Sequence, residues 1–135
     1  VLGIAALLIA LAPLAYERMR EGAQYRDTVR RISADLRQAR QMAAAQGREV
    51  RFVVDLQGRA FGLQDRPAMA LAESLRLDVV VAGIEMAGQQ TAAIRFLPEG
   101  GATGGTIGVL RRSGGGTRLT VDWLSGRVTQ EPLNP

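Results

Sequence analysis

The chain has 135 residues, and its 47% hydrophobic and 22% charged residues are typical of one folding domain rather than of a disordered chain. It contains no Cys and no His, and all seventeen basic residues are Arg. This excludes a disulfide, a thiolate or imidazole catalyst and lysine Schiff-base chemistry within these residues, so we expect neither an enzyme nor a bound cofactor.

The net charge of +4 is unevenly distributed. Residues 17–51 contain nine Arg and five acidic residues, whereas residues 52–135 contain eight of each. The C-terminal two thirds of the chain is therefore electrically balanced, and the surplus of positive charge lies in the first third.

The first sixteen residues carry no charge. Three interpretations compete: a membrane-spanning helix with a shortened front, a signal peptide cleaved after Ala10-Leu11-Ala12, or a buried helix of a soluble protein. The signal-peptide interpretation is the weaker because Pro13 would follow the cut and no basic region precedes the apolar stretch. We therefore favour a membrane helix.

Helical periodicity continues beyond this stretch. Six residues advance by 4, 3, 4, 3 and 4 positions and so share one helix face: Tyr25, Val29, Ile32, Leu36, Ala39 and Ala43. The other faces are charged and carry Arg30, Arg31, Asp35, Arg37 and Arg40. We expect Val29, Ile32 and Leu36 to pack the helix onto a sheet, and Gly47 to end it in a left-handed conformation.

This pattern divides the chain into three parts: a transmembrane part of the helix at 1–16, its amphipathic continuation at 17–47, and a β domain at 48–135. Gly3 and Pro13 are the candidate positions for a kink that matters in assembly, because proline removes a backbone donor and clashes with the carbonyl four residues earlier. If Pro13 only kinks the helix, the helix continues to about Gln46 and is roughly 70 Å long.

The remainder predicts six to eight short antiparallel strands separated by glycine-rich turns. The candidates are 50–54, 59–63, 75–81, 84–86, 93–97, 106–111, 117–123 and 127–129. We expect the first two to form one hairpin and the last two to pair across Leu124-Ser125-Gly126. The stretch 100–106 reads as a hairpin connection, 113–116 as a turn, and Trp123 as a core residue because it alternates with Leu119 and Val121. About 85 residues make a small core, so we expect the apolar helix face to complete it.

Candidate sites for other chemistry are weak. The glycines of 100–106 lack the lysine and the following helix of a phosphate loop, and the carboxylates are too scattered for a calcium site. Arg111, Arg112 and Arg127 could reach phosphates, but the β region is neutral and only 4% of residues are aromatic. We expect no metal site and no nucleic-acid partner.

Several segments together resemble a known family. They are the uncharged helix with an internal proline, the amphipathic extension ending at 42–47, the stretch 94–100 followed by 104–107, and the terminal segment 119–128. This combination resembles the H-type minor pseudopilins of type II secretion and their type IV minor pilin relatives. The family motif falls on Pro98, Gly100, Gly104, Gly105, Gly126 and Arg127.

The resemblance implies an α+β, pilin-like fold in which a long N-terminal helix packs on an antiparallel β domain. It also implies a precursor cut by a prepilin peptidase before an N-methylated Phe, and a single-pass protein of the bacterial inner membrane with its C-terminal domain in the periplasm. The implied partners are major and minor pseudopilins of a filament that helps export folded proteins across the outer membrane. The alternatives are a minor pilin of a type IV pilus, with a role in DNA uptake, and a membrane-tethered β domain that joins no filament.

Overall fold

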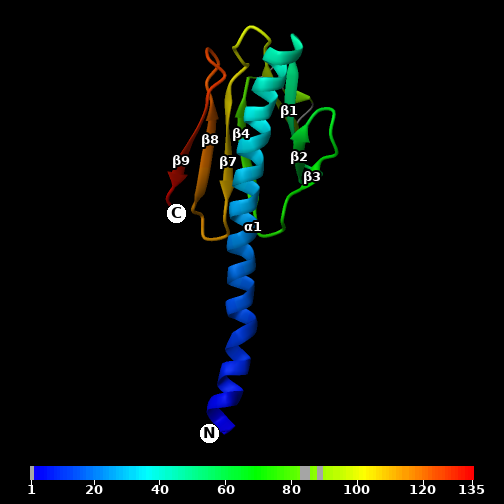
Figure 1. Cartoon of the computed structure of the whole chain (residues 1–135). Helices are drawn as coiled ribbons and strands as arrows, with labels where there is room; N and C mark the ends of the chain where they lie inside the picture. Colours follow the sequence, from blue (N-terminus) through cyan, green and yellow to red (C-terminus); the bar gives the residue numbers. More distant parts are fainter. Residues whose placement is uncertain (1, 83–85, 88–89) are drawn as a thin grey trace.

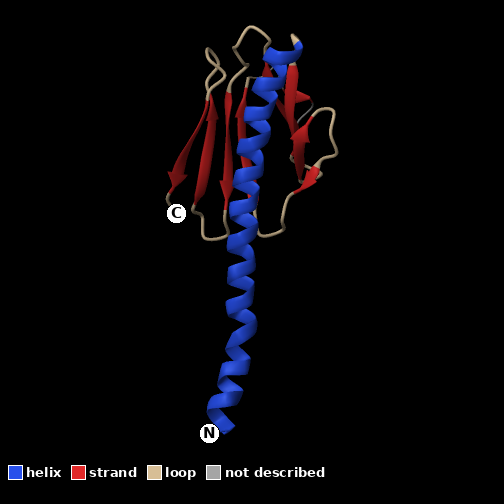
Figure 2. Cartoon of the chain, in the orientation of Figure 1, coloured by secondary structure: helices blue, strands red, loops and turns tan. Residues whose placement is uncertain are grey.

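The computed structural model describes residues 2–82, 86–87 and 90–135. A single long helix, α1 (Leu2–Gln46), lies against antiparallel strands with its C-terminal half and extends beyond them with its N-terminal half (Figures 1 and 2). At 1.5 Å per residue its 45 residues are about 68 Å long. It ends at Gly47, whose φ is +62°, which confirms the predicted left-handed terminator.

The described part of the chain contains nine strands, where the sequence predicted six to eight. The two-residue strand β3 was not predicted. Of the predicted strand 84–86, only Met86 lies within the described residues. The strands are β1 (Val50–Asp55), β2 (Ala60–Leu63), β3 (Met69–Ala70), β4 (Arg76–Val81), β5 (Met86–Ala87), β6 (Thr91–Phe96), β7 (Gly105–Leu110), β8 (Gly116–Val121) and β9 (Val128–Leu133).

These strands form two sheets, in the orders β3-β2-β1-β6-β5 and β4-β7-β8-β9. The predicted hairpins β1–β2 and β8–β9 are confirmed by antiparallel pairing, with Asp55 opposite Ala60 and Val121 opposite Val128. The predicted hairpin connection at 100–106 is wrong. It joins β6 to β7, which belong to different sheets, because β6 pairs with β1 and β7 pairs with β4 and β8.

The helix completes the core, since it contacts strands of both sheets. Its fully buried side chains are Ile32, Leu36, Ala39 and Ala43, and Tyr25 and Val29 are half-buried against the same cluster. The sheets contribute the large buried side chains Phe52, Phe61, Phe96, Ile94, Ile107 and Leu119. Burying each such side chain stabilises the fold by about 1.5–3 kcal/mol relative to exposure.

The prediction that Trp123 is a core residue is wrong, because 67% of it is exposed. Leu119 and Val121 are buried as the alternation requires, but β8 ends at Val121. Asp122 opens a turn there, since its backbone N–H donates to the Arg127 carbonyl at 2.9 Å. The strand therefore ends two residues before Trp123, so its alternation does not carry Trp123 inward.

Candidate assembly surfaces

Where the helix leaves the β domain, it makes several contacts with the β7–β8 hairpin. Arg112 forms an ion pair with Glu21 at 2.9 Å, and the guanidinium of Arg111 lies 5.0 Å from the centre of the Tyr25 ring. The Tyr25 hydroxyl also forms a hydrogen bond with that of Thr117. We call these five residues the collar. The sequence gives no sign of this ion pair, because 91 residues separate Glu21 from Arg112.

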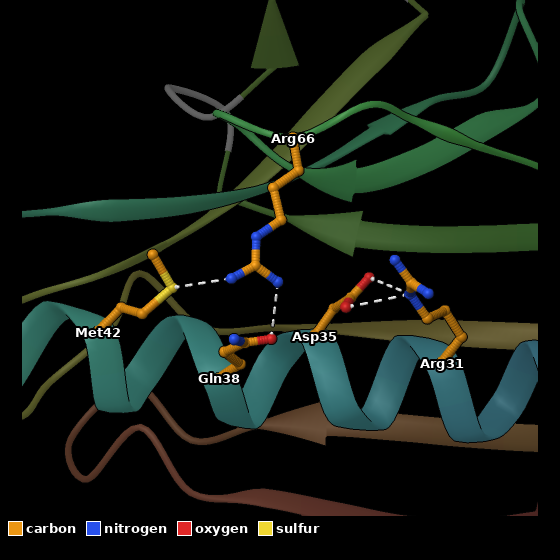
Figure 3. A network of polar contacts seen from close by, with 5 residues as sticks. All are labelled: Arg31, Asp35, Gln38, Met42 and Arg66. Atoms are coloured by element: carbon orange, nitrogen blue, oxygen red, sulfur yellow. Dashed lines mark hydrogen bonds and ion pairs between the residues drawn. The ribbon is translucent and has the colours of Figure 1, made fainter.

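Further along the helix, a second set of polar contacts joins α1 to the turn after β2 (Figure 3). Arg66 donates to the Gln38 side-chain oxygen at 2.9 Å and lies 3.9 Å from the Met42 sulfur. One turn away, Arg31 lies 3.3 Å from the buried carboxylate of Asp35. The amphipathic part of α1 is thus tied to the β domain by polar contacts at two places along its length.

Before the collar, the described side chains of α1 are exposed. Ala15 to Arg20 are all exposed, and two large apolar side chains, Tyr16 and Met19, are 68% and 73% exposed. Pro13 is exposed and Gly3 lies within the helix, which is continuous from Leu2 through Pro13. Among the described residues, no helix is long and apolar enough to cross a membrane. The exposed apolar side chains mark a surface suited to an apolar environment or to a partner.

The motif glycines meet at the opposite end of the β domain. Gly126 has a φ of +72°, and a Cβ there would lie 3.1 Å from the Gly100 carbonyl oxygen and 3.4 Å from Arg40. Gly104 packs on Trp123, where a Cβ would come within 3.0 Å. Loops 97–104 and 122–127 therefore pack on each other only because these positions lack side chains. Of the other motif residues, Pro98 is half-buried and Arg127 is exposed.

Asp122 holds the second of these loops in shape. Its carboxylate accepts hydrogen bonds from the Ser125 hydroxyl at 2.7 Å and the Ser125 backbone N–H at 2.9 Å. These bonds, the one from the hydroxyl first, lower the pKa of the Asp122 carboxyl below its ordinary value. Gly126 adds a backbone hydrogen bond to the Asp122 carbonyl at 2.8 Å.

The arrangement offers little to bind a phosphate chain or a metal. Arg111 and Arg112 lie just before β8 in the collar and Arg127 lies in the loop after it, so the three do not form one patch. Within the described residues, no group of three or more His, Cys, Asp or Glu side chains could hold a metal ion. The structure instead displays three surface features. They are the exposed part of α1 before Glu21, which we call the rod, the collar, and the glycine-containing loops 97–104 and 122–127 at the far end of the β domain.

The geometry defines a pilin-like α+β subunit, in which the C-terminal half of a long helix packs on antiparallel sheets and the N-terminal half stands clear. The family model of the Type II transport protein GspH matches residues 28–126. The chain therefore belongs to the GspH family of type II transport proteins. It is also 30% identical over 133 residues to Type II secretion system protein H of Xanthomonas campestris pv. campestris, an alignment that covers 98% of this chain and 78% of that protein.

Solved structures agree on the fold. Two structures of the minor pseudopilin EpsH from the type II secretion system of Vibrio cholerae match with TM-scores of 0.63 and 0.64. They are 17% and 16% identical to this chain, and the matches cover 80% and 84% of it and 96% of each EpsH chain. The predicted pilin-like fold and the resemblance to H-type minor pseudopilins are confirmed.

Proposed function

We propose that this chain is a structural minor pseudopilin subunit of a type II secretion pseudopilus that assists the export of folded proteins across the outer membrane. The observation that carries the proposal is the division of α1. Its C-terminal half completes the core through Ile32 and Leu36, while the described side chains before Glu21 are exposed. Membership of the GspH family supports a role in assembly. The role proposed is mechanical and needs neither a catalytic group nor a cofactor.

The proposal assigns a place in the cell to each part. Residues 1–16 anchor the subunit in the bacterial inner membrane, residues 17–47 continue the helix, and residues 48–135 form the periplasmic domain. The uncharged sequence of 1–16 and the family resemblance support the anchor. The proposed partners are major and minor pseudopilins, with a prepilin peptidase acting on a precursor.

Gly3 and Pro13 are the positions at which α1 would bend when the subunit passes from the membrane into the filament. Proline weakens the helix locally by about 3 kcal/mol, so bending there costs less than elsewhere. Within a bilayer the freed backbone groups need new partners from neighbouring groups.

Removing residues 1–20 tests the division of labour. We expect the truncated chain to fold, because the side chains described among residues 1–20, those of Pro13 and Ala15 to Arg20, are exposed and lie outside the core cluster. We also expect that it will not restore protein secretion to a strain lacking the gene, whereas the full chain will. Circular dichroism and an exoprotein assay provide the two measurements.

An unfolded truncated chain, or one that restores secretion, would contradict this division. A deletion strain that secretes normally but loses its type IV pili would instead assign the chain to the pilus.

A further inference from the structure

A row of arginines follows one flank of α1. Arg26, Arg30, Arg37 and Arg40, with Ser33 between them, advance by 4, 3, 4 and 3 positions. Each lies one residue after a member of the buried face, so the row lies about 100° around the helix from the core and is about 21 Å long. We call the four arginines the arginine row.

The middle of the row is placed beside the edge strand β9. The buried Ser33 hydroxyl accepts a hydrogen bond of 3.1 Å from the Gln130 side-chain amide, and Arg40 lies against Gly126. The row therefore occupies the flank of α1 that faces β9, one edge of the second sheet (Figure 1). Pro132 within β9 lacks a backbone donor, which disfavours addition of another strand at this edge.

The charges of the row are not neutralised from within the chain. All four arginines are exposed, and in the part of the chain that the structure describes none forms an ion pair or a side-chain hydrogen bond. Glu131, the carboxylate on β9, is paired with Arg118 at 3.1 Å. Asp27 lies about 100° further round the helix and lines the groove on the other flank, beside Met69.

The acidic residues of this chain are poorly placed to pair with the row of a second copy. On the opposite flank, Asp35 is held by Arg31 and Glu21 by Arg112. Along the helix of a second copy this leaves Glu17 and Asp27, which are ten positions apart, and two such carboxylates do not match a row of four arginines. A different chain is therefore the better complementary partner.

We propose that the arginine row binds a carboxylate-bearing helix face on a different subunit of the pseudopilus, running alongside α1. This inference rests on the proposed function and names the surface and the chemistry of one partner. The straight, axial arrangement of the four charges fits a second rod, and the row continues toward the exposed part of the same helix. A single-stranded nucleic acid would find no aromatic platform here, because the aromatic residue nearest the row in sequence, Tyr25, belongs to the collar.

The test compares two variants of the full-length chain that lose the same charge. One carries Arg26→Gln, Arg30→Gln and Arg37→Gln, and leaves Arg40 to support Gly126. The matched control carries Arg48→Gln, Arg51→Gln and Arg76→Gln, which are exposed arginines outside the row, the collar and the family motif. Binding of each purified pseudopilin of the same secretion system, in one detergent, is measured at 50 and 300 mM salt. Thermal unfolding checks that both variants fold.

We expect the row variant to bind one of these pseudopilins about tenfold more weakly at low salt, with a flatter salt dependence, and the control to bind within about twofold of wild type. Arg30→Glu with Arg37→Glu should abolish that binding, and Asp→Arg or Glu→Arg changes on the partner helix should restore it. The restored binding separates a direct contact from a structural effect.

Equal binding by wild type and row variant to every pseudopilin, absence of binding included, would overturn the inference. So would loss of affinity by the row variant for a 20-base-pair duplex alone, which would make the row a nucleic-acid surface. The proposed function has its own measurement, because it fails if the wild-type gene does not restore secretion to the deletion strain.

Discussion

At the scale of single residues, Gly105 is the position where the backbones of two strands come closest. Its φ is +143°, and a Cβ there would lie 2.6 Å from the carbonyl oxygen of Val80 on β4. We expect Gly105→Ala to destabilise the fold by at least about 2 kcal/mol, from the disfavoured backbone and the clash together. Gly100→Ala is the control, since it shares a positive φ but meets no atom within 4 Å. Urea unfolding measures both, and equal losses would show that the contact with Val80 carries no cost.

Asp122 makes the stability of its loop depend on pH. Because the folded pKa of its carboxyl is lowered, its contribution is complete above the unfolded value of about 3.9 and is lost as the pH falls below it, through the folded pKa. We expect Asp122→Asn to be less stable than wild type at pH 7 and the difference to shrink below about pH 4. Ser125→Ala, which removes the donating hydroxyl, should behave similarly. A difference that stays constant from pH 7 to pH 2 would contradict this explanation.

Trp123 shows what a residue-level pattern misses. Alternation with Leu119 and Val121 predicted burial, but the hydrogen bonds of Asp122 end the strand and redirect the chain. Asp and Ser three residues apart are typical of a turn, so the local signal was present in the sequence. This turn signal outweighed the apolar character of Trp123, which is exposed.

At the scale of elements, the helix is held to the sheets by the apolar face that its sequence spacing predicts. Leu36 is fully buried between the sheets and α1, so we expect Leu36→Ala to destabilise the fold by about 2–5 kcal/mol. Gln41→Ala, on the exposed side of the same helix, should change stability by less than about 0.5 kcal/mol. The urea midpoints of the two variants provide the comparison. A negligible shift for Leu36→Ala would mean that the helix contributes little to the core.

Most strands could be predicted from the sequence, but their partners could not. Val50–Asp55 and Ala60–Leu63 are joined by a short turn, so their pairing follows from local pattern. By contrast, β1 also pairs with β6, which begins 36 residues after β1 ends, and no local signal encodes that register. The split between β6 and β7 into two sheets has the same origin. Two-residue β3 is too short to leave a periodic pattern.

The arginine row could have been predicted from the same residue spacing that predicts the core face. Shifted by one residue, the same 4-3-4-3 spacing selects Arg26, Arg30, Arg37 and Arg40. Its lack of ion pairs could not be read from the sequence, because it depends on which charged side chains the fold brings together: Asp35 pairs with Arg31, Glu21 with Arg112 and Glu131 with Arg118. The collar was equally hidden, since it joins the helix to a hairpin more than 85 residues away.

At the scale of the whole molecule, the chain is a rod with a domain fastened along one half of it. The collar marks the boundary between the two halves, and the glycine-shaped loops lie at the opposite end of the sheets (Figure 1). Charge follows the same division, because residues 17–47 of the helix contain seven Arg and four acidic residues, whereas the β domain at 48–135 is nearly balanced with ten Arg and nine acidic residues. Contacts with neighbouring subunits can therefore vary along the helix without disturbing the fold of the domain.

The packing of α1 along the sheets also determines how the molecule responds to force. A load transmitted through the exposed rod acts along the helix axis, and the contacts of Ile32, Leu36, Ala39 and Ala43 are spread along that axis. Such a load shears these contacts together, so many must break in one event. A sideways pull at one end of the packed segment would break the same contacts one after another, at a lower force. The subunit is thus mechanically anisotropic, and a growing or retracting filament would load it along its resistant direction.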